Sequence, residues 1–164
     1  MITLQPITED NFEDVLRLRA SEDFVATNAY SLAEAYCDLK EAIDNGEQYH
    51  KYCYSIPYAI SKDETIVGFL KMNFEDGEDI NADDDIYWLS RFMIDEKHQG
   101  KGYGKAAMEV FIDFVKSKPH GYEVKYIYTS VVPDNHIATK LYERVGFVKT
   151  GNQLEGEDLM KLDL

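Results

Sequence analysis

Gln99-Gly100-Lys101-Gly102-Tyr103-Gly104-Lys105 is the most informative segment of this 164-residue chain. It lies between residues 86–94, whose aromatic and branched side chains predict a strand, and residues 104–118, whose amphipathic spacing predicts a helix. Glycines at such a junction let the backbone approach a ligand and leave N–H groups free at a helix N-terminus, where the dipole favours an anion. The segment therefore predicts a phosphate cradle, with Lys101 and Lys105 adding positive charge.

The spacing of these glycines differs from that of two common phosphate-binding motifs. Dinucleotide-binding folds use Gly-x-Gly-x-x-Gly, and P-loops end in Gly-Lys followed by Ser or Thr. This chain instead has Gly-x-Gly-x-Gly, late in its length. From the glycines alone, a phosphate cradle and a purely structural β-to-α turn both remain open.

On both sides of the glycine segment, periodicity and turn signals predict short strands and helices. Ser31 and Glu34 have the spacing of a capping box, which predicts a helix from Ser31 to Asn45-Gly46. This order of elements predicts a single mixed α/β domain over residues 1–164. The expected strands are 2–6, 56–61, 66–74, 86–94, 124–132, 147–154 and 158–164, and the other expected helices are 11–19, 104–118 and 135–145.

Two segments together resemble the sequence pattern of a known enzyme family. Gln99-x-x-Gly102-x-Gly104 resembles the Gln/Arg-x-x-Gly-x-Gly/Ala signature of the GNAT superfamily of N-acetyltransferases, whose loop binds the pyrophosphate of acetyl-CoA. Residues 135–147 are similar to the family's Asn-x-x-Ala-x-x-Leu-Tyr-x-x-x-Gly-Phe segment. Within the family, residues 88–102 most resemble bacterial spermine/spermidine N-acetyltransferases.

The resemblance implies an α/β (α+β) fold with about six or seven strands in a mixed central sheet and about four flanking helices. A splayed parallel strand pair would bind acetyl-CoA, with the pantetheine arm between the strand that ends at Ile94 and the strand that begins near Val124. The backbone of Phe92, Met93 and Ile94 would pair with the pantetheine amides, and the N–H of Phe92 or Met93 would polarise the thioester carbonyl. The other implied cofactor-binding residues are Gln99, Gly100, Lys101, Gly102, Tyr103, Gly104, Lys105 and Asn135, the last of which also suits an ordinary helix N-cap.

Tyr142 and Ser90 are the implied catalytic residues. Tyr142 corresponds to the tyrosine that the family often uses as general acid toward the thiolate, although its spacing alone equally fits a core aromatic. Ser90 stands where animal diamine acetyltransferases have a glutamate. Because a serine is not a base by itself, it would act by ordering water that passes the proton to an acidic residue or to solvent. Strand alternation would turn the neighbouring Arg91 to the opposite face, where a structural salt bridge is expected.

The charge of the chain is strongly negative and unevenly distributed. The formal net charge is −14, and residues 1–85 carry 20 acidic and 6 basic side chains, whereas residues 86–164 carry 11 of each. Such a chain would repel nucleic acid and anionic membranes, so neither is expected as a partner. Two interpretations of the negative charge remain open. It attracts a cationic small-molecule amine as the partner, or it serves only to keep the protein in solution.

Four residues are candidate contacts for the acceptor amine: Tyr30, Glu34, Asp85 and Trp88. The resemblance places the acceptor between the first two helices and the acidic loop of residues 75–85, where carboxylates would hold ammonium groups and aromatic rings would contact methylenes. Three functions remain open. They are acetylation of a polyamine such as spermine or spermidine, acetylation of another cationic amine such as an aminoglycoside or a basic peptide N-terminus, and non-catalytic acyl-CoA sensing.

The remaining composition predicts a cytoplasmic protein without a metal. Cys37, Cys53 and the four histidines lack the spacing of a disulfide scaffold or a metal site. No run approaches the roughly 20 apolar residues of a membrane span, and residues 1–6 lack the pattern of a signal peptide. The resemblance also leaves a homodimer open, because the family is often dimeric.

Overall fold

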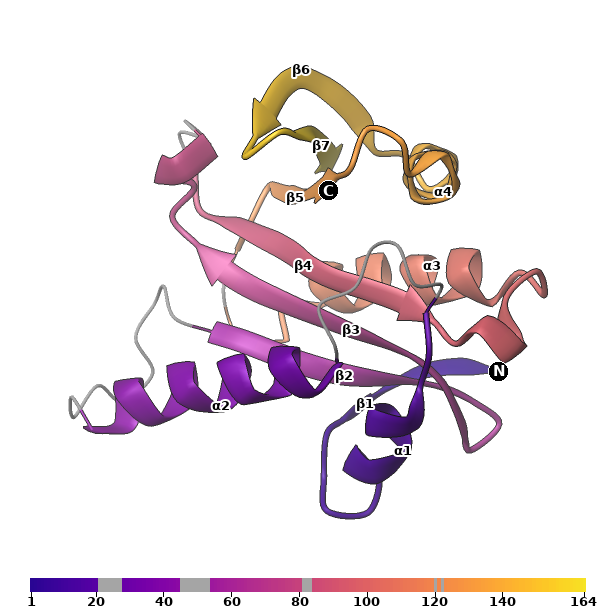
Figure 1. Cartoon of the computed structure of the whole chain (residues 1–164). Coiled ribbons are helices and arrows are strands. Elements are labelled where there is room, and N and C mark those ends of the chain that lie inside the picture. The colour runs from indigo at the N-terminus through magenta and orange to yellow at the C-terminus, as the bar shows by residue number, and fades with distance from the viewer. Residues whose placement is uncertain (21–27, 45–53, 81–83, 120, 122) are drawn as a thin grey trace.

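Seven strands form one sheet with helices on both of its faces (Figure 1). The computed structural model describes residues 1–20, 28–44, 54–80, 84–119, 121 and 123–164. The strand order is β1-β2-β3-β4-β5-β7-β6, and β4–β5 is the parallel pair among otherwise antiparallel pairs. The mixed sheet and the α/β fold expected from the sequence are therefore confirmed. In chain order the elements are β1 (Ile2–Pro6), α1 (Phe12–Arg17), α2 (Asn28–Asp44), β2 (Tyr54–Lys62), β3 (Thr65–Glu75), η2 (Glu78–Ile80), β4 (Ile86–Ile94), η3 (Glu96–His98), α3 (Tyr103–Lys116), β5 (Tyr126–Val131), α4 (His136–Arg144), β6 (Val148–Leu154) and β7 (Glu157–Asp163).

The two faces of the sheet bury separate apolar clusters. Phe69 on β3 packs with Val15 and Leu18, which come from α1 and the residue that ends it. The next residue, Leu70, turns to the other face and joins the main core with Phe111 of α3. This alternation is the pleat of a strand that is buried on both sides. Figure 1 accordingly shows α2 and α3 on opposite sides of the sheet.

The parallel strands β4 and β5 separate along their length. They pair at two positions only, Tyr87 with Ile127 and Trp88 with Tyr128. From residue 90 to residue 94, β4 continues beside β3 but has no pairing with β5. The edge of β4 that faces β5 therefore carries backbone groups that no strand satisfies, as the expected splayed pair requires.

The start of α2 differs from the prediction. A capping-box serine must precede the helix, but α2 begins at Asn28, so Ser31 lies within its first turn and is 1% exposed. The Asn28 Nδ2 donates to the Val15 carbonyl at 3.0 Å, which fixes the start of α2 against α1. Glu34 is consequently free to turn toward the sheet instead of capping the helix. The predicted end of this helix, at residues 45–46, lies outside the described residues.

Candidate active site

A cleft of about 990 Å³ lies beside the point where β4 and β5 separate. Its walls come from α2, β3, β4, β5 and the turn between β6 and β7. Carboxylates outnumber cationic side chains in this lining, so the cleft suits a positively charged ligand. The charged lining residues are Glu34, Glu75, Asp76, Glu155 and Glu157 on the negative side, and Lys71 and Arg91 on the positive side.

A β-bulge at Ser90 shapes the floor of the cleft. Along the β3–β4 ladder, Lys71 pairs with Arg91 and Met72 pairs with Leu89, so Ser90 is the extra residue. The bulge interrupts the alternation of side chains, and both Ser90 and Arg91 line the cleft. The expectation that Arg91 faces away from Ser90 is therefore wrong, because strict alternation does not hold across a bulge.

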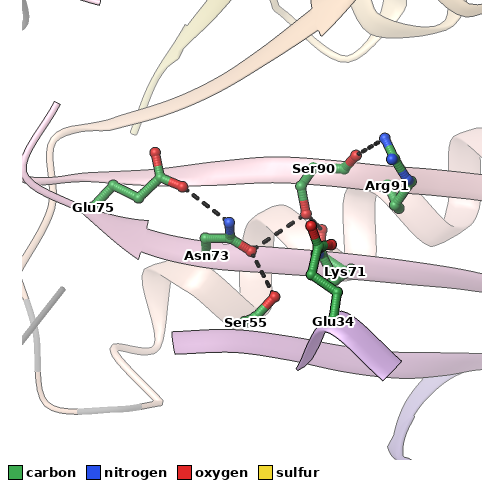
Figure 2. A network of polar contacts seen from close by, with 7 residues as sticks. All are labelled: Glu34, Ser55, Lys71, Asn73, Glu75, Ser90 and Arg91. Atoms are coloured by element: carbon green, nitrogen blue, oxygen red, sulfur yellow. Dashed lines mark hydrogen bonds and ion pairs between the residues drawn. The ribbon is translucent and has the colours of Figure 1, made fainter. Parts of the chain in front are cut away.

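Ser90 belongs to a network of polar side chains on the floor of the cleft (Figure 2). Its Oγ lies 3.1 Å from the Lys71 carbonyl oxygen and 3.3 Å from Asn73 Oδ1, so its hydroxyl donates to these acceptors. Ser55 Oγ also donates to Asn73 Oδ1 at 3.2 Å, and Asn73 Nδ2 donates to Glu75 Oε1 at 2.9 Å. With its proton used in this way, Ser90 keeps its lone pairs available to accept a hydrogen bond from a donor such as an amine.

A buried lysine stands beside this network. The Lys71 side chain is 3% exposed, and its Nζ pairs with the Glu34 carboxylate, which is 38% exposed (Figure 2). Burial of an ammonium is costly unless a counter-charge accompanies it, so Glu34 compensates Lys71. The inner part of the cleft therefore holds an ion pair, and the remaining carboxylates carry its excess negative charge.

Two serines lie at equivalent positions on the separating strands. Ser90 on β4 and Ser130 on β5 each lie two residues beyond the last paired position, and both line the cleft. Ser130 Oγ donates to a carboxylate oxygen of Glu157 at the start of β7. Between the strands, Thr129 Oγ1 donates to the Leu89 carbonyl at 2.9 Å, where it bridges β4 and β5 just beyond their last backbone pair.

Tyr142 of α4 lies next to Thr129, the residue that makes this bridge. Tyr142 is 6% exposed, and its ring packs against Phe147 with centroids 5.5 Å apart. The pKa of Tyr142 is raised to about 12, mainly by burial; a hydrogen bond with Thr129 lowers it, and the charge of Glu157 adds to the rise. The phenol therefore stays protonated at neutral pH and is able to donate a proton.

The hydrogen-bond phase of β4 determines which backbone groups point toward β5. The Asp95 N–H donates to the Val67 carbonyl of β3 at 2.9 Å. Because the backbone groups of successive residues point to opposite sides of a strand, those of Met93, two residues earlier, also point toward β3. The N–H and C=O groups of Phe92 and Ile94 consequently point away from β3, toward the space between β4 and β5. Of the two N–H groups considered for the thioester carbonyl, the register favours that of Phe92.

The glycine segment forms the N-terminus of α3. Gly100 and Gly102 have φ angles of +73° and +79°, and Gly102 is the N-cap, without a side-chain cap. The Ala106 N–H donates to the Gly102 carbonyl at 3.2 Å, so the N–H groups of residues 103–105 have no carbonyl one turn earlier. This arrangement provides the anion-binding geometry that the glycines predict.

Several residues implied as cofactor contacts also make local bonds. Gln99 Nε2 donates to the Ile94 carbonyl at 2.9 Å, which ties the end of β4 to the loop. Asn135 caps α4, because its Oδ1 accepts from the Ala138 N–H at 3.1 Å. Lys101 Nζ donates to the carbonyl of residue 97 at 2.9 Å. These bonds order the loop and the start of α4, and any cofactor role comes in addition to them.

The candidate acceptor contacts do not all gather in the cleft. Glu34 and Trp88 line it together with Ser90. Tyr30 on α2 is 58% exposed and does not belong to the lining, and Asp85 lines a separate depression beside Asp84. Tyr30 and Asp85 therefore lie outside the cleft lining. Only an acceptor that extends beyond the cleft would contact them.

Sequence reasoning missed Lys71, Glu155 and Glu157 as cleft residues. The alternation of polar Lys71, Asn73 and Glu75 with apolar neighbours was a usable signal, because a strand buried on both faces places polar side chains only at a special surface. Glu155 and Glu157 come from the half of the chain with balanced charge, so the charge distribution did not indicate them.

Two further features concern the described part of the chain only. None of its helices is both long and apolar enough to cross a bilayer. Within the same residues, no set of three or more His, Cys, Asp or Glu side chains is placed to hold a metal ion. The expected absence of a metal stays a prediction.

Comparison with known proteins identifies the family. Residues 14–147 match the model of the Acetyltransferase (GNAT) family. The spermine/spermidine N(1)-acetyltransferase of Bacillus subtilis (strain 168) is 30% identical over 164 residues, which cover 99% of both chains. An acetyltransferase of the GNAT family from Streptococcus pneumoniae superposes with a TM-score of 0.68 at 15% identity, over 100% of this chain and 99% of that one. The PaiA N-acetyltransferase of Thermoplasma acidophilum, solved with coenzyme A, gives 0.64 at 15% identity with the same coverage. The chain belongs to the GNAT family of acetyltransferases.

Proposed function

We propose that this acetyltransferase transfers the acetyl group of acetyl-CoA to a primary amine of spermine or spermidine by direct attack on the thioester. The observation that carries the proposal is the acidic cleft beside the separating strands β4 and β5, whose described lining residues include five carboxylates and two cationic side chains. The Bacillus subtilis relative, named for spermine and spermidine, supports the same class of acceptor.

We expect the cofactor to bind along the separated part of β4 and at the N-terminus of α3. The N–H groups of residues 103–105 and the positive end of α3 would hold the pyrophosphate, and Lys101 and Lys105 would add charge. The pantetheine arm would pair with the edge of β4, where the backbone of Phe92 and Ile94 points toward β5. The coenzyme A complex of the Thermoplasma protein supports this choice of cofactor.

The residues near the separation can supply the groups that acetyl transfer needs. The Phe92 N–H would stabilise negative charge on the thioester oxygen as the tetrahedral adduct forms. Tyr142, which keeps its proton at neutral pH, would donate it to the leaving thiolate. Ser90 would accept a hydrogen bond from the attacking nitrogen, because its own proton is directed at acceptors on β3.

A polyamine matches the charge of the proposed acceptor cleft. It is an extended chain of methylenes with an ammonium at intervals of a few carbons, so it can reach several carboxylates at once. Glu75, Asp76 and Glu155 would bind the ammonium groups that do not react, and Trp88 would contact the methylenes. An aminoglycoside or a basic peptide N-terminus carries the same charge with more bulk, and stays the alternative acceptor.

Acetyl-CoA-dependent thiol release against a panel of amines tests the proposal. The panel contains spermine, spermidine, putrescine, lysine, an aminoglycoside and a short basic peptide. We expect the highest kcat/KM with spermine or spermidine. Activity confined to the aminoglycoside or the peptide would keep the enzyme class and refute the polyamine assignment. Tight acetyl-CoA binding without thiol release for any amine would instead support a non-catalytic acyl-CoA sensor.

A further inference from the structure

We infer that Glu157 is the catalytic residue that takes the proton from the attacking nitrogen. This inference rests on the proposed function. It names a general base for the reaction, because Ser90 cannot act as a base by itself. Three independent observations support it: the position of Glu157 in the cleft, the bonds of the competing carboxylates, and its electrostatic contact with Tyr142.

Glu157 stands where the two strands separate. Ser130 lies two residues beyond the last paired position of β5, and its hydroxyl holds the Glu157 carboxylate. Ser90 occupies the equivalent position on β4, across the separation. An amine that approaches the thioester between these strands would pass between Ser90 on one side and the Ser130–Glu157 pair on the other.

Two other carboxylates of the cleft are less suited to act as the base. Glu34 is paired with the buried ammonium of Lys71, so its carboxylate is already engaged by a cation. Glu75 accepts from Asn73 and pairs with Ile86, on the side where β4 and β5 are joined. Glu157 is half-buried and beside the separated part of the strands, with a hydroxyl as its partner.

Tyr142 and Glu157 are electrostatically coupled across the strands. The negative charge of Glu157 contributes to the raised pKa of Tyr142, after burial as the main cause. Neutralisation of Glu157 by a proton would remove that contribution. Tyr142 would then become a stronger acid at the stage at which the thiolate needs its proton, so the two transfers support each other.

The reaction balances with these two residues. The free amine attacks the thioester carbon, the C–N bond forms, and the carbonyl π electrons move to oxygen. Glu157 takes a proton from the cationic nitrogen of the adduct. The oxyanion electrons then re-form the carbonyl, and the C–S bond breaks with its electron pair going to sulfur, which takes the phenolic proton of Tyr142. The proton on Glu157 then returns to the Tyr142 phenolate through solvent, and the products are the N-acetylamine and the thiol of coenzyme A.

The test compares Glu157→Gln with Glu155→Gln in the full chain, using acetyl-CoA and spermidine. Both variants remove one negative charge from the same hairpin and the same cleft. Loss of a general base predicts a fall of about a hundredfold or more in kcat for Glu157→Gln. Glu155→Gln is expected to raise the KM for spermidine without a comparable change in kcat. Glu157→Asp, which retracts the carboxylate, is expected to keep part of the kcat.

Coenzyme A affinity and thermal unfolding of each variant report whether the fold is intact. A double variant with Tyr142→Phe adds a second measurement. If both residues serve one proton circuit, the double variant loses much less kcat than the product of the single losses. Equal, KM-only effects of the two glutamine variants would overturn the role of Glu157, and so would multiplicative losses in the double variant.

The outcome for the wild type separates this inference from the proposed function. If another amine proves the best acceptor, the polyamine assignment fails, and the same pair of variants with that amine still decides the role of Glu157. If spermidine is acetylated and Glu157→Gln keeps its kcat, only the inference fails. If no amine is acetylated, both fail together.

Discussion

The ammonium of Lys71 on β3 and the carboxylate of Glu34 on α2 form an ion pair that joins the sheet to this helix at the edge of the cleft. The two partners differ in their surroundings, because the Lys71 side chain is 3% exposed and the Glu34 side chain 38%. Water can therefore replace the partner of Glu34 but not that of Lys71. The pair fixes the helix that forms one wall of the acceptor cleft.

This asymmetry predicts unequal effects of the two truncations on stability. Glu34→Ala leaves a buried ammonium without a counter-charge and is expected to lower the free energy of unfolding by about 3 kcal/mol or more. Lys71→Met leaves an exposed carboxylate and fills the buried space with an apolar chain, so its cost is expected to be below about 1.5 kcal/mol. Urea unfolding at neutral pH measures both, and equal costs would refute the asymmetry.

Tyr142→Phe is expected to reduce kcat by about 10²- to 10⁴-fold, because it removes the phenolic proton from the leaving thiolate. Coenzyme A affinity should stay nearly unchanged, since the ring and its contact with Phe147 are retained. Tyr126→Phe is the matched control, because its ring lies under Lys161 and away from the strand separation. A Tyr142→Phe enzyme with the wild-type kcat would remove the tyrosine from the mechanism.

The same tyrosine predicts a pH dependence of stability. Folding raises the pKa of Tyr142 from its ordinary 10 to about 12, so the folded protein holds this proton more tightly than the unfolded chain. The resulting stabilisation is complete below pH 10 and is lost as the pH rises through 12. Relative to pH 8, wild type should lose about 1 kcal/mol more than Tyr142→Phe by pH 11. Urea unfolding of the two proteins at both pH values tests this, and parallel pH dependences would contradict it.

Gly104→Ala separates the stability of α3 from cofactor binding. A Cβ at this position would lie 3.5 Å from Leu141 Cδ2, which is an ordinary contact, so alanine fits. Because alanine favours a helix over glycine, the substitution should stabilise the fold by about 0.5–1 kcal/mol. If the glycine exists to admit the pyrophosphate, coenzyme A affinity should fall in the same variant. Thermal unfolding and calorimetric titration measure the two effects, and unchanged affinity would show that close approach at this residue is unnecessary.

The features that the sequence predicted are those with local causes. The amphipathic spacing of residues 104–118 and the glycines before them depend on neighbours within a few turns, so α3 and its N-terminus were predictable. The strands and the final hairpin followed from alternation and from the turn at Glu155-Gly156. No local pattern predicts where two strands separate. The splayed strand pair was therefore expected from the family resemblance alone.

The features that the sequence did not predict depend on pairing between distant segments. The bulge at Ser90 is defined by its register against β3, and strict alternation placed Arg91 on the wrong face. Ser31 and Glu34 fit a capping box, but Glu34 pairs with Lys71, 37 residues later in the chain. Glu157 enters the site through Ser130, which the β5–β7 pairing brings near. Each depends on a tertiary interaction that no local pattern predicts.

The charge of the cleft predicts a salt dependence that grows with the charge of the acceptor. At saturating acetyl-CoA, the KM for spermidine should rise several-fold between about 50 and 500 mM NaCl, because added salt screens the carboxylates of the cleft from the ammonium groups. The kcat should change little, since the reacting groups lie close together. A monoamine of similar length is the control, and its KM should respond more weakly because it places one charge in the cleft. Equal salt dependences for both amines would mean that the excess carboxylates do not contact the acceptor, and that the negative charge of the chain serves solubility instead.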